Sequence, residues 1–194
     1  MDELPELKPL TISCSDTKCD EGLHCFRPNL RKRKWKETYN GACNVCGATL
    51  LEWDPARRRN LADIPATFAE LKTEYIRHEF FHRSFDSDAL ADAAKRGPAG
   101  LRGRVRPVLK SGIAAAKPWR DGNQTPMVGS AVNYGRHATA TCCRKCLEYW
   151  YGIPRGRPLV MEELDFCEAL VLAYLEERSP ELWPGSGPGG GQAE

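Results

Sequence analysis

Hydrophobic positions follow a helical period from residue 63 onward but show little regularity before it. Between residues 64 and 82 they recur every three or four positions, in a row made of Ile64, Phe68, Leu71, Tyr75, His78 and His82. This spacing predicts one amphipathic helix whose buried face continues through the two histidines. Residues 1–60 are instead rich in Cys, Gly, Pro and charged residues, a composition typical of a fold held together by metal.

Further helices are predicted in the rest of the chain. One begins near the capping residue Ser87 and stops at Gly97, and a basic stretch at 101–109 is expected to be short or kinked by its internal proline. Two more cover 142–151 and 162–178. The segment 117–127, which lies between the basic stretch and the helix at 142–151, is expected to form an ordered loop because it contains Asp-Gly and Thr-Pro pairs.

The predicted fold is mainly α with a small β zinc-ribbon or treble-clef-like module at the N-terminus and two zinc sites. We expect a zinc-knuckle module at residues 1–60, a helical metal-binding domain at 61–183 and a disordered tail at 184–194, where glycine dominates.

Cysteine usage and charge indicate a cytoplasmic protein. Eight of the nine cysteines fall in tight groups, which in a reducing compartment favours metal thiolates over disulfides. The N-terminus is acidic, and no apolar run approaches the ~18 residues that a membrane span needs. The net charge is only +2, so any nucleic-acid binding must come from a local patch. The sequence gives no prediction of the oligomeric state.

The first predicted zinc site is built on the knuckle Cys43-Asn44-Val45-Cys46-Gly47, whose spacing and trailing glycine suit a structural zinc ion. Its other half lies upstream. Cys14 and Cys19 have a suitable separation, and Cys25, which follows His24, is the alternative to Cys14. Four thiolates would form a closed site without catalytic function.

The second predicted site combines two histidines one helical turn apart with a cysteine-rich turn further along the chain. The candidates for its four places are His78, His82, His137, Cys142, Cys143 and Cys146. Cys143, Cys146 and His82 are favoured, together with either His78 or His137, because thiolates at a helix N-terminus are stabilised by the helix dipole.

Residues 78–82 also read His-Glu-Phe-Phe-His, the HExxH pattern of zinc peptidases, in which the glutamate is the general base. A peptidase needs an open fourth position on the metal, whereas nearby thiolates would close the site. Whether the protein is an enzyme stays undecided at this point, and Glu79, Asp121 and His137 are the candidate catalytic residues.

A basic segment before the knuckle is the candidate nucleic-acid surface. It places six positive charges in ten residues and offers Trp35 and Phe26 for base stacking. The residues assigned to it are Arg27, Arg31, Lys32, Arg33, Lys34, Trp35 and Lys36. Arginines at 57–59 and at 102, 104 and 106 repeat the pattern more weakly, and a solvated face explains these charges equally well.

The C-terminal half resembles a family of uncharacterised bacterial domains. The residues that carry the resemblance are DGNQTPM at 121–127, HATATCCRKCLEYW at 137–150 and GIPRGRPL at 152–159, where the family has DGKQTPM and HATATCCRxCLExWHGIPxGR. The resemblance implies one shared site that includes Asp121, His137 and the three cysteines, but implies no activity. This chain departs from the pattern at Asn123, at Gly135-Arg136 and at Tyr151, where the family tends to have histidine.

These patterns predict a protein with two Zn²⁺ ions per chain. Its favoured function is a zinc-stabilised binding module that contacts nucleic acid through the basic segment. The alternative is a zinc-dependent hydrolase that uses the second group of ligands.

Overall fold

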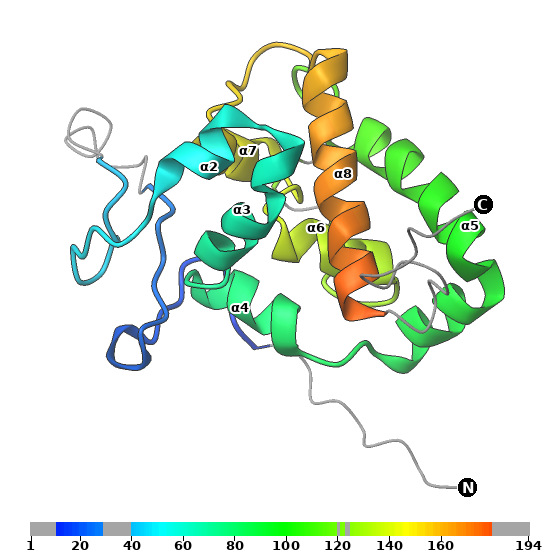
Figure 1. Cartoon of the computed structure of the whole chain (residues 1–194), viewed down its shortest axis with the longest axis horizontal. Helices are drawn as coiled ribbons and strands as arrows, with labels where there is room; N and C mark the ends of the chain where they lie inside the picture. Colours follow the sequence, from blue (N-terminus) through cyan, green and yellow to red (C-terminus); the bar gives the residue numbers. More distant parts are fainter. Residues whose placement is uncertain (1–10, 29–39, 120, 123–124, 180–194) are drawn as a thin grey trace, which may run out of the picture.

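The computed structural model describes residues 11–28, 40–119, 121–122 and 125–179, so the predicted tail at 184–194 lies outside it (Figure 1). The elements in chain order are η1 (Cys19–Glu21), α2 (Trp53–Arg58), η2 (Leu61–Asp63), α3 (Ile64–Leu71), α4 (Tyr75–His82), α5 (Ser87–Ile113), α6 (Ala131–Ala138), α7 (Arg144–Tyr151) and α8 (Met161–Arg178). The prediction of a mainly helical fold is confirmed. The predicted β module is not seen in the described residues, where β pairing is limited to isolated bridges of Lys18 with Leu23 and of His24 with Glu74.

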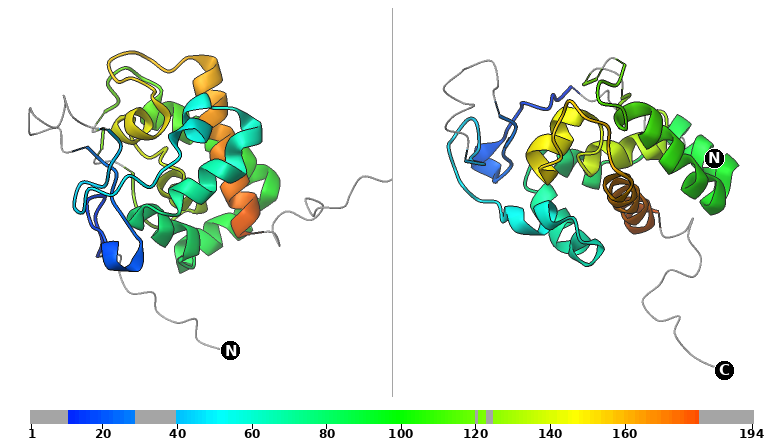
Figure 2. Two further views of the ribbon diagram at one scale, coloured as in Figure 1. Left: turned by 60° about the vertical axis from the view of Figure 1, so that its left-hand side comes forward. Right: turned by 90° about the horizontal axis from the view of Figure 1, so that it is seen from above.

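Helix α8 crosses the middle of the molecule, with α2, α3 and α4 on one side and α5 on the other (Figure 1). It packs against α5 and α6, and α6 packs in turn against α4. The segment 11–28 lies on the side of α3 and α4, away from α5, in both Figure 1 and the right-hand view of Figure 2. Phe26, Cys43 and Ala56 share one buried core with the helices, and the domain boundary at residue 60 stays a prediction.

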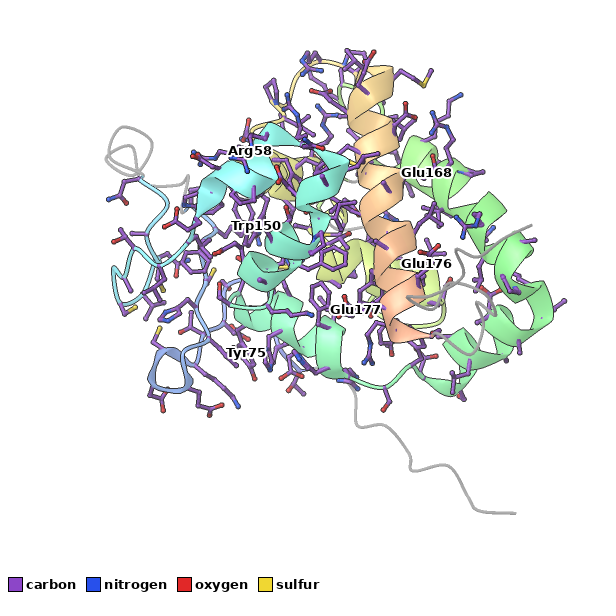
Figure 3. The ribbon with its side chains drawn as sticks, viewed as in Figure 1. Arg58, Tyr75, Trp150, Glu168, Glu176 and Glu177 are labelled. Atoms are coloured by element: carbon purple, nitrogen blue, oxygen red, sulfur yellow. The ribbon has the colours of Figure 1, made fainter. Side chains whose placement is uncertain are left out.

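Helix α5 meets α8 through a buried row at four-residue spacing, formed by Leu101, Val105, Leu109 and Ile113. Ion pairs flank this row, joining Arg102 to Glu176 at 2.6 Å and Arg106 to Asp165 at 2.7 Å. Glu168 and Glu176 lie on the side of α8 that faces α5 (Figure 3). No helix in the described part of the chain is long and apolar enough to cross a membrane.

The kink in α5 lies at Gly97 and not at Pro107. Gly97 has φ 63° and ψ −179°, which separates α5 into two helical halves, and Pro98 starts the second half. A positive φ suits glycine, which has no side chain to clash. The stretch at 101–109 is therefore part of a long helix, and the N-terminal cap is Asp86, whose Oδ1 accepts a hydrogen bond from the N–H of Ala89 at 2.9 Å.

The single helix predicted from residue 63 to residue 82 is two helices in the structure. The N–H of His24 donates to the carbonyl of Thr73 at 2.9 Å, and the N–H of Tyr75 donates to the carbonyl of His24 at 2.8 Å. Because residues 73–75 pair with this distant segment, the chain leaves the helix there and α4 starts in a new direction. As a result, His78 is half-buried and His82 is exposed instead of continuing a buried face.

Candidate metal centres

The first group of ligands begins with a short turn around η1. Gly22 follows η1 with φ 76°, and Lys18 and Leu23 exchange backbone hydrogen bonds of 2.8 and 3.0 Å. The chain therefore reverses direction, which brings His24 close to Cys19.

The knuckle supplies the other half. The N–H of Gly47 donates to the carbonyl of Cys43 at 3.0 Å, and Gly47 takes the positive φ of 77° that ends the turn. The two halves are joined by the N–H of Asn44, which donates to the carbonyl of Cys25 at 2.9 Å.

Four ligand atoms from Cys19, His24, Cys43 and Cys46, which we call the first cluster, lie within 4.8 Å of one another. The sulfur atoms of Cys19 and Cys43 are 3.9 Å apart, and Nδ1 of His24 is 3.4 Å from the sulfur of Cys46. Although burial disfavours the thiolate of Cys43, hydrogen bonds from backbone N–H groups and from His24 lower its pKa to about 6. Three sulfurs and one imidazole at these separations suit a single tetrahedral ion.

The structure places His24 in the first cluster and leaves Cys14 and Cys25 out of it. Burial raises the pKa of Cys25 to about 12, and its thiol donates to the carbonyl of Cys14 at 3.3 Å, so Cys25 is a packed thiol. Burial also raises the pKa of Cys14 to about 12, and the charges that act on Cys14 are those of Arg77, Cys146, Cys142 and Arg27.

Cys142, Cys143 and Cys146, which we call the second cluster, lie where α6 turns into α7. Cys143 is the N-cap of α7, and Cys146 lies one turn into the helix. Cys146 is 3.6 Å from Cys142 and 3.4 Å from Cys143 between sulfur atoms, and all three residues are 7% exposed or less. Thr125 holds the turn through a 2.8 Å hydrogen bond to the carbonyl of Cys142.

Positive charge surrounds the second cluster. The Arg77 guanidinium donates to the sulfur of Cys146 at 3.1 Å and approaches that of Cys142 at 3.8 Å. Hydrogen bonds from the other two thiols lower the pKa of Cys142 well below its ordinary value, and Arg77 and Arg136 lower it further against the effect of burial. The same thiol hydrogen bonds raise the pKa of Cys143. Within the second cluster, Cys142 is therefore the sulfur whose thiolate is stabilised.

Arg77 is itself held by a fully buried carboxylate. Glu74 and Arg77 are both 0% exposed and are joined by a 3.1 Å ion pair. The Glu74 carboxylate also accepts hydrogen bonds from the Trp150 indole at 2.8 Å, the Tyr149 hydroxyl at 2.9 Å and the N–H of Phe26 at 3.3 Å. Burial raises the pKa of Glu74 against the opposing charge of Arg77. Because all of these partners donate, they stabilise the ionised carboxylate.

His137 lies at the end of α6, and its ring stacks on Phe80 with a centroid separation of 4.8 Å. Burial and the charge of Arg77 lower the pKa of His137 to about 4, so the ring is neutral. His137 is not one of the ligands of the second cluster, whose three sulfur atoms lie within 4.8 Å of one another. Asp121 has a structural contact, since its Oδ1 accepts a 3.0 Å hydrogen bond from the N–H of Arg144 in the first turn of α7.

The structure does not bring His78 and His82 to the cysteines of the second cluster. The centroids of the two rings are 4.1 Å apart and their planes are tilted by 32°, and neither residue belongs to a group of potential metal ligands among the described residues. Nδ1 of His82 contacts the carbonyl of His78 at 2.8 Å, and Nδ1 of His78 contacts that of Lys72 at 3.2 Å. Glu79 is half-buried on the same helix, so the HExxH pattern here lies on a helix surface.

Most of the predicted nucleic-acid surface lies outside the described residues, namely Arg31, Lys32, Arg33, Lys34, Trp35 and Lys36. Phe26 is 0% exposed and packs edge-on against Trp53, so it is not available for base stacking. Arg27 is half-buried; although burial lowers its pKa, the charges of Cys146 and Cys14 raise it.

Three of the residues that build these centres were missed by sequence reasoning, His24 for one reason and the pair Glu74 and Arg77 for another. His24 follows Cys19 with four residues between them, the same separation as from Cys14 to Cys19, so the spacing alone could have suggested it. Glu74 and Arg77 are three positions apart, a spacing typical of ion pairs on an exposed helix face. Their burial depends on residues about 75 positions away in the sequence.

The fold and its two groups of clustered cysteine and histidine side chains define the protein as a helical chain with two candidate metal centres. The chain belongs to the DUF4186 family, a domain of unknown function, whose family model matches residues 65–176, more than half of the chain. The second cluster lies inside the match, and the first cluster lies outside it. No solved structure matches the chain.

Proposed function

We propose that this protein binds two zinc ions and uses the first of them to present its basic segment to nucleic acid. The observation that carries the proposal is the pair of separate clusters, one of three cysteines and a histidine and one of three cysteines, each with its ligand atoms within 4.8 Å. Soft thiolates combined with imidazole in a tetrahedral arrangement favour zinc over magnesium, calcium or manganese, which prefer oxygen ligands.

The first cluster supports a role in presenting the basic segment because its ligands stand on both sides of that segment. His24 precedes residues 27–36 and Cys43 follows them, so one ion would fix both ends of the loop. The same ends are held by Asn44, whose side chain donates to the carbonyl of Arg27 at 3.2 Å. A loop closed in this way loses less entropy when it binds a phosphate backbone.

The other arginine groups are engaged within the protein. Arg58 pairs with Asp63 at 3.0 Å, Arg57 lies 4.9 Å from the centre of the Trp53 ring, and Arg59 donates to the carbonyl of Tyr151 at 3.2 Å. Together with the ion pairs of α5 to α8, these contacts leave residues 31–36 as the best candidate for phosphate contacts.

The hydrolase alternative receives less support. A hydrolytic zinc ion needs an accessible fourth position and a base beside it. The second cluster is buried, Asp121 is bonded to the N–H of Arg144, and Glu79 lies on α4 outside both groups of ligands.

Metal content measured by mass spectrometry on the purified full-length chain tests zinc binding. We expect two zinc ions per wild-type chain and one per chain after either Cys43→Ser with Cys46→Ser or Cys143→Ser with Cys146→Ser. His78→Gln with His82→Gln is the matched control and should keep both ions. A wild-type chain with no bound zinc, or a control that loses an ion, would contradict the proposed sites.

Nucleic-acid contact is tested by the fluorescence anisotropy of a labelled single-stranded oligonucleotide over a salt series. Each lost phosphate contact lowers the slope of log affinity against log salt by ~0.7, so a triple change of Lys32, Arg33 and Lys34 to Gln should lower it by about 2. The charge-matched control changes the exposed Lys95, Arg104 and Lys110 of α5, which lies on the opposite side of α8 from α2, α3 and α4 (Figure 1). Equal losses in the two variants, or no salt-dependent binding by the wild type, would rule out this surface.

A further inference from the structure

We propose that Nδ1 of His137 is the fourth ligand of the metal ion at the second cluster, which makes this site closed and structural. The inference rests on the proposed function, since it requires that an ion binds to Cys142, Cys143 and Cys146. Three sulfur atoms within reach of one ion leave one tetrahedral position to be filled.

The hydrogen bonds of His137 fix which ring nitrogen carries the lone pair. Nε2 lies 3.3 Å from the carbonyl oxygen of Thr125 and 3.2 Å from that of Pro126. Carbonyl oxygens only accept, so Nε2 carries the hydrogen and Nδ1 of the neutral ring is unprotonated. A zinc-bound histidine has this arrangement, in which one nitrogen binds the ion and the other donates to a backbone carbonyl.

Nδ1 has no hydrogen-bond partner in the described structure, although the residue is only 4% exposed. Buried polar atoms in proteins are nearly always paired, so a lone pair left unpaired in the core indicates a missing partner. A metal ion supplies that partner. Six other buried side-chain atoms of the described residues are also unpaired, but they belong to Asn, Thr and Arg side chains, so His137 is the one residue among the seven of a type that binds zinc.

Arg77 ties His137 to the second cluster. One guanidinium nitrogen, Nη1, donates to the carbonyl of His137 at 2.6 Å and approaches the sulfur of Cys142 at 3.8 Å. The Phe80 ring, at 18° to the imidazole, limits its movement to sliding within its own plane. The imidazole is not part of the group formed by the three sulfur atoms of the second cluster, which lie within 4.8 Å of one another. To bind the same ion, the ring would therefore have to move toward these sulfur atoms.

The charge balance around the second cluster favours a neutral fourth ligand over the thiolate of Cys14. Zinc with Arg77 and Arg136 carries four positive charges, and the three thiolates with the Glu74 carboxylate carry four negative ones. Arg77, Arg136 and Glu74 are each 4% exposed or less. An imidazole preserves this balance among the buried groups, whereas the thiolate of Cys14 would add a negative charge whose further positive neighbour, Arg27, is only half-buried.

Cobalt-loaded full-length protein tests the assignment through its visible absorption. We expect His137→Gln to weaken cobalt binding at one of the two sites by at least 10-fold and to change the ligand-field bands of that site, while Cys14→Ser leaves both bands and affinity unchanged. His137→Cys should restore a tetrahedral spectrum with stronger thiolate-to-cobalt absorption. A change in Cys14→Ser without one in His137→Gln would overturn the proposal and assign the position to Cys14.

Cadmium NMR of the wild-type chain gives an answer that needs no variant. Two resonances in the range of three sulfurs and one nitrogen support His137, whereas one in the four-sulfur range, or one that shifts when azide is added, overturns it. A wild-type chain that takes up no cobalt or cadmium at the second cluster would instead contradict the proposed function itself. The two failures are therefore distinguishable.

Discussion

Glu74→Gln is the most informative single change, because it removes one charge from the fully buried network between the clusters. The carboxylate accepts hydrogen bonds from Arg77, Tyr149, Trp150 and Phe26 over distances of 2.8 to 3.3 Å. A glutamine amide keeps the size, but its NH₂ group would face donors and Arg77 would lose its carboxylate partner.

Breaking a buried ion pair by removing one partner costs about 3–5 kcal/mol. A chain of this length loses roughly 2–4 °C in melting temperature per kcal/mol, so the variant should melt about 10 °C below the wild type. The measurement is thermal unfolding followed by circular dichroism with excess zinc, with the metal content of each variant determined beforehand.

The matched control is Glu176→Gln, which breaks the partly exposed 2.6 Å pair with Arg102. A surface pair of this kind contributes less than about 1 kcal/mol, so the control should melt within about 3 °C of the wild type. If the melting temperature of Glu74→Gln is as close to that of the wild type as the control's is, the buried carboxylate is not ionised. The count of charges around the second cluster would then be wrong.

Two further predictions follow from the packing and from the thiol pKa shifts. Gly135→Ala should destabilise the protein by about 1–3 kcal/mol in denaturant unfolding, because the added Cβ would meet Val171 at 3.0 Å and Tyr174 at 3.1 Å. Gly103→Ala, where the added Cβ meets nothing within 4 Å, should be neutral or stabilising, and equal losses in the two variants would contradict this packing. The pKa of Cys43, about 6, means that this thiol is mostly ionised at pH 7, so zinc uptake by both clusters should release about one proton fewer than their six thiols carry, and the lowered pKa of Cys142 acts in the same direction. Calorimetry in buffers of different ionisation enthalpy measures this number, and a release of six would refute it.

The elements that could be predicted from the sequence are those whose boundaries are local. Helix α7 ends at Gly152, which has φ 64°, and α8 buries the predicted Leu164, Cys167 and Val171. The break between α3 and α4 depends on the pairing of residues 73–75 with His24, and no local signal marks it. Helix α6 was not predicted, because its eight residues include Gly135 and its burial comes from α4 and α8.

The candidate sites follow the same rule. The knuckle and the cysteines of α7 are visible as short spacings, which is why the three sulfurs of each cluster could be named. The choice among histidines depends on which helix face is buried, and the turn before α4 changes that face. His82 is therefore exposed and His78 half-buried, while His24 and His137 are buried.

Because His24 forms a bridge with Glu74, we expect the two halves of this chain to unfold as one cooperative unit. His24 belongs to the first cluster, and Glu74 holds the arginine that contacts the second, so their adjacent backbones connect the two centres directly. Cutting the chain near residue 60 would remove Phe26 from the core and leave residues 73–75 without the backbone hydrogen bonds to His24. In the intact chain, hydrogen exchange at the amides of Tyr75 and His24 should report the same opening free energy, since neither amide can be freed while the other stays protected.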